Sequence, residues 1–572
     1  MEDVSQNMRN EFELSQMNKA QKAVYYLREY GMGFFLRKVA KKLGVKENAD
    51  DIYRSWLHAN SPSRKELSQQ KNQTFAKKPH VCVVIDGVKK PEMQIARAVK
   101  SVREQTYSDY QVVVNTEKMD VHSLLSHAQQ EAEIFLFVAA EVVLRPQMLF
   151  EVVKAWNREE EFDCAYVDED CLQKGKFCRP YFKPDKDEEL LLNFQYLGGA
   201  IAVSAAWLKQ QAEVDLWGND WYDLALRLFE SGAQILHISE VLFARASEAW
   251  ENGIYRDTTG SGKKYIEESL KRRGIAAKVC EGRVPGFYHV QYTFARKPLV
   301  SIIIPNKDHV VELSTCINGI LNNNSYDNYE IIIAENNSQE EATFRYYEEI
   351  VEQHDRIQVV YWRKEFNYSA INNFAAENAK GELLLFLNND TEIINRDCLE
   401  ELVQCCYREG IGAAGAMLYY PDNTIQHAGV VMGIGGFAAH ALWSLSDQDE
   451  RYYPYSVTMR EFSACTGACL LVSAEVFREV GGFEEKLQVA LNDIDLCMKI
   501  RALGKKIIFN PYAKMYHYES KSRGYEDSQE KIERFNREIA FFQEKWKTQL
   551  EAGDPYYNKN QTLHRADYSV EW

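Results

Sequence analysis

The sequence lacks several features that would place a protein in a familiar class at once. No stretch approaches the roughly 18 uninterrupted apolar residues of a transmembrane helix. The N-terminus is polar and has no apolar signal-peptide core, so we expect the protein to stay in the cytoplasm. The twelve cysteines include no Cys-x-x-Cys pair. This favours reduced, mostly buried thiols over disulfides or a zinc site.

Two nucleotide-binding signatures are also missing. No Gly-x-Gly-x-x-Gly follows a predicted strand, and Gly433-Ile434-Gly435-Gly436 has the wrong spacing. No Walker lysine loop is present either. The net charge of −16 argues against a general nucleic-acid binder, which would carry a basic footprint. These absences disfavour nicotinamide-dependent enzymes, P-loop enzymes and nucleic-acid-binding proteins.

One basic segment stands out against the acidic average. Between Lys19 and Lys42 there are seven basic residues and a single acid, Glu29, interleaved with apolar side chains. The pattern predicts an amphipathic helix, which could lie on an anionic membrane surface. It could equally pack on the next domain with its basic face in solvent, and the sequence leaves both possibilities open.

The chain contains a diverged internal repeat. The 572 residues suffice for about three domains. The matching segments are Lys78–Ile85 with Lys297–Ile304, Asp109–Val114 with Asn328–Ile333, and, at a longer offset, Ile134–Glu141 with Leu383–Asp390. In the first two pairs both the prolines (298 − 79 = 219) and the tyrosines (329 − 110 = 219) keep one offset. Such ungapped register indicates a duplicated domain.

Strand-like and helical patterns alternate in the second copy. The predicted strands are 300–305, 330–334 and 383–387, and the predicted helices are 310–322 and 368–380. This rhythm implies a parallel sheet with right-handed crossovers. We therefore expect an α/β protein with two tandem domains of mixed, mainly parallel sheets. The predicted divisions are a basic helical segment at 1–75, domains at 76–290 and 297–550, and an irregular tail at 551–572.

Polar residues follow three predicted strands of the second copy. These segments are Pro305-Asn306-Lys307-Asp308, Glu335-Asn336-Asn337-Ser338 and Asn388-Asn389-Asp390. In open α/β sheets ligands bind beyond the carboxyl ends of the strands, so the three segments predict a polar crevice of nucleotide size. Taken alone, Asp390 could merely cap the next helix.

Together these motifs resemble the family 2 glycosyltransferases of the GT-A fold, in the two-domain, rhamnosyltransferase-like branch that builds bacterial surface polysaccharides. The resemblance covers roughly residues 297–547. Further motifs carry it in order: Gly481-Gly482-Phe483-Glu484-Glu485, Asn492-Asp493-Ile494-Asp495-Leu496 and Tyr516-His517-Tyr518-Glu519-Ser520. Asn388 departs from the family pattern, because it replaces the first Asp of an Asp-x-Asp metal motif.

The resemblance implies a role for each motif. Sugar-nucleotide binding falls to Pro305, Asn306, Asp308, Glu335, Asn337, Asn373, Asn388 and Asn389. Glu335 takes the position that holds the nucleobase. Asp390 and His517 become metal ligands, and Asp493 the catalytic base. Asn492, Asp495, Lys521 and Arg523 are candidate phosphate or acceptor contacts, although Asp495 is also a candidate helix cap. His427 and His440 are candidates on the acceptor side.

The implied chemistry suits these residue types. A divalent cation neutralises the diphosphate leaving group, and Mn²⁺ or Mg²⁺ accepts one or two carboxylates plus phosphate oxygens. A carboxylate takes the proton of the attacking hydroxyl when it lies about 3 Å away. One base and no enzyme nucleophile imply inversion at the anomeric carbon. Taken alone, Asp493 could cap its helix and His517 could be a packed histidine.

The first copy has lost most of these groups. Ala139-Ala140-Glu141 stands at the metal position, Asn115 or Thr116 at the Glu335 position, and Leu242-Phe243-Ala244-Arg245 in the region of His517. We read this copy as a degenerate or acceptor-organising domain. Asp168-x-Asp170 is formally a metal motif, but it lies far past the strand end that the fold would use.

The sequence thus predicts a metal-dependent, inverting glycosyltransferase. It would move a sugar, with rhamnose from dTDP-rhamnose as first choice, from a nucleoside diphosphate sugar to a lipid-linked polysaccharide acceptor. It would work in the cytoplasm, peripherally at the inner face of the plasma membrane, without nucleic acid. A bifunctional polymerising enzyme and a non-catalytic glycan-binding scaffold are the alternatives. Asn388 favours the scaffold, while Asp390, Asp493 and His517 favour the enzyme.

Overall fold

The computed structural model describes residues 48–128, 131–158, 162–211, 214, 216, 221–246, 260–519 and 529–570. The predicted amphipathic segment at Lys19–Lys42 lies outside these residues. Helix α3 (Ala49–Asn60) belongs to one compact unit, and Pro62–Tyr568 form the other. The described residues contain no helix with the length and apolarity needed to span a membrane.

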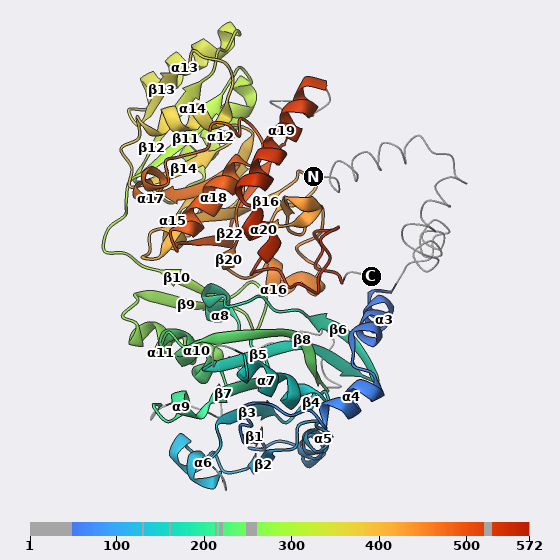
Figure 1. Cartoon of the computed structure of the whole chain (residues 1–572). Coiled ribbons are helices and arrows are strands. Elements are labelled where there is room, and N and C mark those ends of the chain that lie inside the picture. Colours follow the sequence, from blue (N-terminus) through green and yellow to red (C-terminus); the bar gives the residue numbers. More distant parts are fainter. Residues whose placement is uncertain are drawn as a thin grey trace, which may run out of the picture. The chain divides into compact units, whose positions relative to one another are not determined.

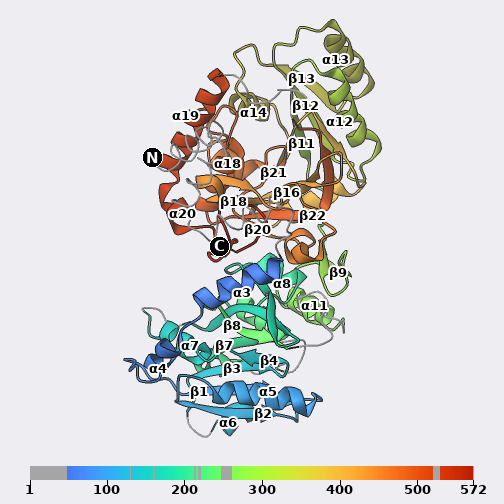
Figure 2. The same ribbon diagram turned by 90° about the vertical axis from the view of Figure 1, so that its right-hand side faces the viewer.

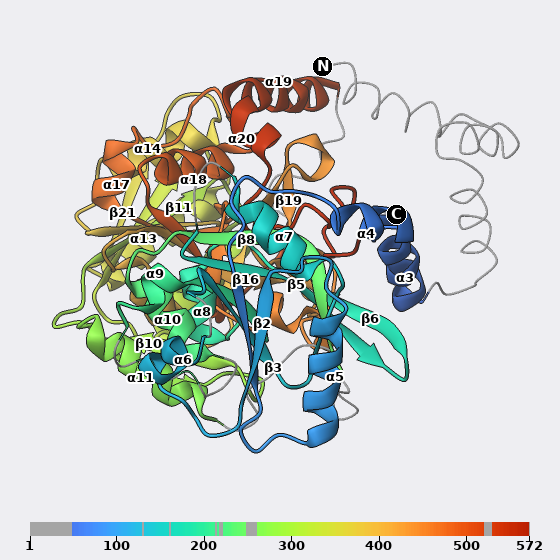
Figure 3. The same ribbon diagram turned by 60° about the horizontal axis from the view of Figure 1, so that its bottom comes forward.

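The first half of the larger unit is built on an eight-stranded sheet (Figure 1). Its strands are β1 (Val81–Asp86), β2 (Tyr110–Asn115), β3 (Ile134–Ala139), β4 (Val142–Leu144), β5 (Cys164–Gln173), β6 (Lys176–Tyr181), β7 (Ala200–Ser204) and β8 (Ile235–Arg245). Its helices are α4 (Arg64–Gln70), α5 (Glu92–Arg103), α6 (Val121–His127), α7 (Met148–Trp156), α8 (Glu188–Asn193), α9 (Ala205–Leu208), α10 (Tyr222–Glu230) and α11 (Gly262–Arg272). Helix α5 packs on β1 and β4. Figure 3 shows this helix in blue. The hairpin β9 (Ala277–Glu281) and β10 (Tyr288–Tyr292) follows.

The second half is built on a ten-stranded sheet (Figure 2). Its strands are β11 (Val300–Asn306), β12 (Tyr329–Glu335), β13 (Ile357–Tyr361), β14 (Leu383–Leu387), β15 (Thr391–Ile393), β16 (Ile411–Tyr419), β17 (Ile425–His427), β20 (Arg460–Phe462), β21 (Cys469–Ser473) and β22 (Lys506–His517). Its helices are α12 (Val310–Asn322), α13 (Glu341–Gln353), α14 (Tyr368–Ala376), α15 (Cys398–Cys406), α16 (Tyr453–Ser456), α17 (Ala474–Glu479), α18 (Asn492–Ala502), α19 (Gln529–Lys545) and α20 (Lys547–Ala552), with 3₁₀ turns η1 (Ile434–Gly436) and η2 (Glu450–Tyr452). The small pair β18 (Val430–Met432) and β19 (Ala438–His440) lies apart from this sheet.

The two large sheets share one strand order. The first runs β2-β1-β3-β7-β5-β8-β4, and the second runs β12-β11-β14-β21-β16-β22-β15 with β13 added at its edge. The registers agree as well, since Val81 pairs with Tyr110 as Val300 pairs with Tyr329. The prediction of mixed α/β sheets is confirmed. Parallel pairing joins the first strands of each sheet, and most of the other pairings are antiparallel.

The second-half prediction matches the strands more closely than the helices. Strand β14 is buried along its whole length, as expected for a continuous apolar run in the middle of a sheet. Helix α14 begins after Asn367, whose side chain accepts a hydrogen bond from the Ala370 N–H, and it ends at Ala376 rather than 380. The prediction omitted α13 and β13. Most of α13 faces solvent, and Thr343, Tyr347 and Ile350 form its one buried face at helical spacing, so the prediction overlooked a period that the sequence contains.

Helix α8 of the first half contacts residues of the second half. Glu189 accepts hydrogen bonds from Arg408 at 2.9 Å and from the Tyr292 hydroxyl at 3.0 Å. Glu188 accepts one from Lys506 at 2.7 Å. Burial raises the pKa of Glu188, but Lys506 and Arg273 lower it by more, so its pKa lies below the usual value. The contacts are charged and largely buried, so the first half supports the second through specific pairs.

The C-terminal residues are irregular but packed. Tyr557 and Tyr568 are buried, and their rings lie 5.2 Å apart. Asn558 donates from Nδ2 to Asp168 Oδ2 at 2.9 Å and to the Lys183 carbonyl at 3.0 Å. The formal Asp168-x-Asp170 motif therefore holds the C-terminal segment: Asp168 is fully buried and also lies 2.9 Å from a His237 ring nitrogen.

Candidate functional site

Three parallel strands end at one polar edge of the second sheet. Asn306 is the last residue of β11 and pairs in register with Glu335, the last residue of β12. Asn388 directly follows β14, which pairs with β11 on its other side. The chain thus brings together the three polar segments that the sequence placed after these strands, at the edge where ligands bind in such sheets.

A buried hydrogen-bonded chain runs along this edge. Asn389 donates to Asn306 Oδ1 at 2.6 Å, and Asn306 donates to the Tyr347 hydroxyl at 2.8 Å. Tyr347 in turn donates to Glu335 Oε2 at 2.7 Å. Burial raises the pKa of Tyr347, so this hydroxyl keeps its proton and acts as a donor. Linked donors of this kind polarise one another and fix the side chains in place.

The acidic groups of the edge shape its loops. Glu335 Oε1 accepts from the Ser338 N–H at 2.5 Å, and Oε2 accepts from the Ser338 hydroxyl at 2.6 Å. Asp308 Oδ1 accepts from the Gln339 and Glu340 N–H groups at 2.8 and 2.9 Å, just before α13. Both carboxylates therefore bind their own chain, which pre-forms the loops around the predicted nucleotide position.

The predicted asparagines also bind backbone groups. Asn373 accepts from the Phe483 N–H at 2.8 Å and donates to the Phe483 carbonyl at 3.0 Å. Asn337 donates to the Lys364 carbonyl at 2.7 Å, and Asn492 to the Val489 carbonyl at 3.1 Å. Pro305 is half-buried on β11. These residues hold the turns that border the edge.

The two predicted metal ligands meet at the end of β14. The short strand β15 pairs with β22 and places His517 beside Asp390. His517 Nε2 lies 3.4 Å from Asp390 Oδ1 and 3.4 Å from Asn388 Nδ2. Asp390 is 4% exposed and His517 is 6% exposed.

These groups fit a divalent cation with two protein ligands. The described residues contain no cluster of three His, Cys, Asp or Glu side chains that could hold a metal alone. His517 Nε2 faces Asp390 Oδ1 at 3.4 Å, so a single cation could contact both atoms. A carboxylate and an imidazole would hold Mn²⁺ or Mg²⁺ when diphosphate oxygens and water complete the shell.

Asp493 is connected to the same place by a short series of hydrogen bonds. Its Oδ2 accepts from the Gly467 N–H at 2.7 Å. The Tyr368 hydroxyl lies 3.0 Å from the Gly467 carbonyl and 3.2 Å from Asn388 Oδ1. A Cβ at position 467 would lie 3.2 Å from the Asp493 Cβ, so this close approach favours glycine. The predicted base and the predicted metal ligands therefore border one site, and Tyr368 and Gly467, which the sequence analysis missed, join them.

Asp495 binds residues away from the site. It is fully buried and accepts hydrogen bonds from Lys545 at 3.0 Å and from the Trp546 indole at 2.8 Å. It thereby anchors the C-terminal end of α19. Lys521 and Arg523 lie outside the described residues.

Two histidines pack behind Asp493. His427 Nδ1 lies 3.2 Å from His440 Nδ1, and the Thr466 N–H lies 3.4 Å from His427 Nε2. Burial lowers the pKa of His427 far below its usual value, and the neighbouring His440 and His517 act in the same direction. Burial also lowers the pKa of His440, against the attraction of Asp493 and Glu519. The pair is therefore neutral at pH 7.

The corresponding place in the first half holds a side-chain cation. In the β4–β8 pairing the residue after Glu141 faces Arg245, just as the residue after Asp390 faces His517 in β15–β22. Arg245 Nη1 lies 3.5 Å from Glu141 Oε1, and Arg245 Nε lies 2.8 Å from Glu169 Oε1. The guanidinium is fully buried, so it occupies the position of the predicted metal ligand in the second half.

Two other predicted functional positions are also changed there. Asp223 is the second residue of α10 as Asp493 is of α18, and each helix follows a residue with left-handed backbone, at φ 64° and 60°. Asp223 is paired with Arg227 at 2.9 Å and Arg272 at 3.3 Å. At the end of β2, Asn115 takes the register position of the predicted nucleobase ligand. Each change replaces or neutralises a group that the second half presents.

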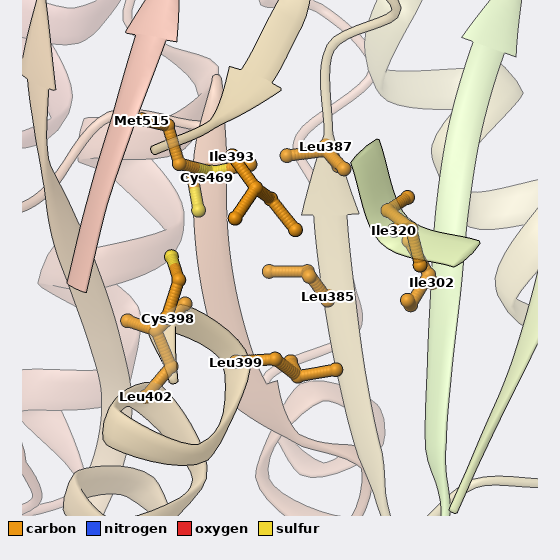
Figure 4. A pocket seen from close by; sticks show the side chains of 10 residues that line it. All are labelled: Ile302, Ile320, Leu385, Leu387, Ile393, Cys398, Leu399, Leu402, Cys469 and Met515. Atoms are coloured by element: carbon orange, nitrogen blue, oxygen red, sulfur yellow. The ribbon is translucent and has the colours of Figure 1, made fainter. Parts of the chain in front are cut away.

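A small apolar cavity lies in the core of the second half (Figure 4). Its lining residues are Ile302, Ile320, Leu385, Leu387, Ile393, Cys398, Leu399, Leu402, Cys469 and Met515. A cavity of about 10 Å³ with no polar lining has room for no more than one water and offers it no hydrogen bonds. It is a packing void, and it has no part in binding a nucleotide. Eleven of the twelve cysteines, including Cys398 and Cys469, are buried.

The second half of the chain matches a known protein family. Residues 297–539 match the family described as "Glycosyltransferase like family 2". The chain is 38% identical over 437 residues to the uncharacterized protein y4gI of Sinorhizobium fredii, covering 74% of this chain and 48% of that protein. It is 32% identical over 553 residues to the O-antigen biosynthesis protein RfbC of Myxococcus xanthus, covering 90% and 43%. It is also 28% identical over 123 residues, 20% of the chain and 39% of the relative, to an N-acetylglucosaminyl-diphospho-decaprenol L-rhamnosyltransferase of Mycobacterium tuberculosis. The chain thus spans less than half the length of each of these relatives.

Proposed function

Since residues 297–539 of this chain are a family 2 glycosyltransferase domain, we propose that the protein is a metal-dependent, inverting glycosyltransferase of surface-polysaccharide synthesis. One observation carries the proposal. The Asp390–His517 pair and Asp493 lie at one site, joined through Asn388, Tyr368 and Gly467. A cation-binding pair beside a carboxylate is the arrangement that sugar transfer from a diphosphate donor needs.

The residues divide the chemistry between them. A bound Mn²⁺ or Mg²⁺ supplies charge neutralisation for the departing diphosphate. Asp390 and His517 would hold that ion. Asp493 would accept the proton of the attacking hydroxyl, in line with its half-buried carboxylate and its position at the start of α18. The Gly467 N–H fixes one carboxylate oxygen at 2.7 Å, so the base is oriented before the acceptor arrives.

The loops that carry Glu335 and Asp308 would receive the nucleotide. Their carboxylates bind backbone N–H groups and hold the loops in one conformation. Asn306, Asn389 and Asn337 belong to the same polar edge. Pre-formed loops lower the entropy cost of binding a flexible ligand.

We take rhamnose from dTDP-rhamnose as the first donor to test, and a lipid-linked glycan at the inner face of the plasma membrane as the acceptor. Relatives named for O-antigen biosynthesis and for L-rhamnosyl transfer to a diphospho-decaprenol lipid support this choice. A cytoplasmic, peripheral location suits a sugar-nucleotide donor.

The first half would act as a degenerate domain that supports the second. Arg245 stands in the place of His517, and Asp223 is paired with two arginines. A buried guanidinium repels a divalent cation, so this half should bind no catalytic metal. These features favour one active centre over the bifunctional alternative.

The test is an assay of sugar-nucleotide hydrolysis and transfer with the purified chain. We expect turnover of at least one donor in a panel of dTDP-, UDP- and GDP-sugars with Mn²⁺, and its loss with a chelator. The non-catalytic scaffold alternative, favoured by the single Asn388 replacement, predicts binding without turnover. Absence of both thermal protection and turnover with every donor would overturn the proposal.

A further inference from the structure

One aromatic side chain beside the site is left open to solvent. Trp443 is 58% exposed, the most exposed aromatic side chain in the part of the chain that the structure describes. Tryptophan carries a large apolar face, and most of its surface is normally covered. An exposed tryptophan near a proposed glycosyltransferase site is suited to bind a ligand that has an apolar face.

The turn that carries Trp443 is held in a strained form. Leu442 and Ser444 on either side both have φ 58°, which bulky residues such as leucine rarely adopt. The turn is fixed by backbone hydrogen bonds from the Leu442 N–H to the Ala566 carbonyl at 2.7 Å and from the Ser444 N–H to the Ile425 carbonyl at 2.8 Å. Strain that the surroundings maintain is commonest at ligand sites.

The polar edge of the indole is fixed as well. Trp443 Nε1 donates to the Tyr420 hydroxyl at 2.9 Å, and Tyr420 donates to Glu519 Oε2 at 2.7 Å. Nearby on the same strand as His517, Tyr516 donates to Asn423 Oδ1 at 2.7 Å. The ring is therefore held in one orientation, with hydroxyl and carboxylate groups at its rim.

A series of contacts links this surface to the predicted base. His440 precedes Trp443 by three residues and contacts His427, which accepts from the Thr466 N–H, next to the Gly467 that binds Asp493. Glu519 accepts the hydrogen bond from Tyr420, and it lies two residues after His517, the predicted metal ligand at the end of β22. Trp443 thus lies beside the ends of β16 and β22, and β11, β14 and β21 separate these two strands from β12, which carries Glu335.

We propose that Trp443, with Tyr420 and Glu519, is the platform that binds a sugar ring of the acceptor. This inference rests on the proposed transferase function and specifies its acceptor side. A pyranose has a face of C–H bonds and a rim of hydroxyls. The indole face would cover the C–H bonds, while Tyr420 and Glu519 would hydrogen-bond the hydroxyls. The ring would then present one hydroxyl toward Asp493.

The test combines binding and turnover. Octyl glycosides of rhamnose, galactose, glucose and N-acetylglucosamine serve as acceptor probes at millimolar concentration. We expect at least one to change the intrinsic tryptophan fluorescence saturably in the wild type, and the change to disappear in Trp443→Phe. We expect Trp443→Ala to raise the KM for that acceptor by about tenfold or more, and Trp443→Phe by about threefold or less, because phenylalanine keeps an apolar face.

Controls separate this inference from the proposed function. Donor hydrolysis by water should stay within about twofold in Trp443→Ala, because the donor side is intact, and its thermal midpoint should shift by about 2 °C or less. Leu503→Ala, which truncates another exposed apolar side chain (40% exposed), should leave the acceptor KM unchanged. Donor turnover with no fluorescence response to any glycoside, or with an unchanged KM in Trp443→Ala, overturns the platform alone. Loss of all donor turnover and binding in the wild type overturns the proposed function and the platform with it.

Discussion

The replacement Asp493→Asn tests the assignment of the base most directly. Asp493 accepts two backbone hydrogen bonds, from the Gly467 N–H at 2.7 Å and from the Ile494 N–H at 2.8 Å. An asparagine has one carbonyl oxygen, so it keeps one of these bonds and loses the other. The cost to stability is about 1 kcal/mol, which a folded chain of this size tolerates.

The cost to catalysis should be much larger. The amide cannot take a proton, and removing a general base lowers the rate by about 10²- to 10⁴-fold. This corresponds to about 3 to 5.5 kcal/mol of activation free energy. The difference between a small loss of stability and a large loss of rate is what distinguishes a base from a helix cap.

The assay compares kcat for sugar transfer with Mn²⁺, together with the thermal midpoint of each variant. Asp120→Asn provides a matched control, because Asp120 caps α6 of the first half and accepts from the Ser123 N–H at 2.6 Å. Asp120→Asn should lower the midpoint slightly and leave kcat unchanged. If Asp493→Asn keeps more than about a tenth of the wild-type kcat, the base assignment is refuted.

Four further outcomes follow from the geometry. His517→Ala should raise the Mn²⁺ concentration for half-maximal rate by at least about tenfold, or about 1.4 kcal/mol, in a metal titration, and an unchanged titration would remove His517 as a ligand. With nucleotide present, the wild type and Glu141→Gln should both bind one Mn²⁺ ion per chain. A second ion in the wild type would contradict the interpretation of the first half as degenerate. Asp495→Asn should lower the thermal midpoint by the equivalent of roughly 1–3 kcal/mol, because the amide keeps one carbonyl oxygen but loses the charge and the second acceptor that hold the buried Trp546 indole and the partly exposed Lys545. A midpoint equal to that of the wild type would be inconsistent with this anchor. Burial lowers the pKa of His427 in the folded protein, whereas the histidine of the unfolded chain titrates near 6.5. Below pH 6.5 the unfolded state therefore binds more protons, and the free energy of unfolding should fall by up to about 1.4 kcal/mol per pH unit. His427→Gln should flatten this decline in melting curves recorded between pH 7 and 5.5.

The duplication and most of the strands could be predicted from the sequence. Strand signals such as Leu383–Leu387 are short continuous apolar runs, and a strand in the middle of a sheet is buried on both faces whatever surrounds it. The ungapped register of the repeat predicted two α/β sheets, and the common strand order agrees with it. Helix α13 has its buried residues Thr343, Tyr347 and Ile350 at helical spacing, so it could also have been predicted from the sequence.

The candidate site was predicted in part. The strand-end segments and the position of Asp493 came from local patterns and from the family resemblance. Their partners did not, because Tyr368 and Gly467 reach Asn388 and Asp493 across long sequence separations. A single tyrosine or glycine in a sequence carries no signal of such a contact.

The order of residues along the chain was therefore enough to establish two related α/β sheets with a polar edge in the second, since periodicity and strand-end chemistry are local properties. Only the folded chain decided which carboxylates serve which purpose. Asp493 and Asp495 are two residues apart on one helix, yet one borders the site and the other holds Lys545 and Trp546. Arg245 and His517 take equivalent positions only because β8 pairs with β4 and β22 pairs with β15. These strands are far apart in the sequence, so their pairing could not be read from it.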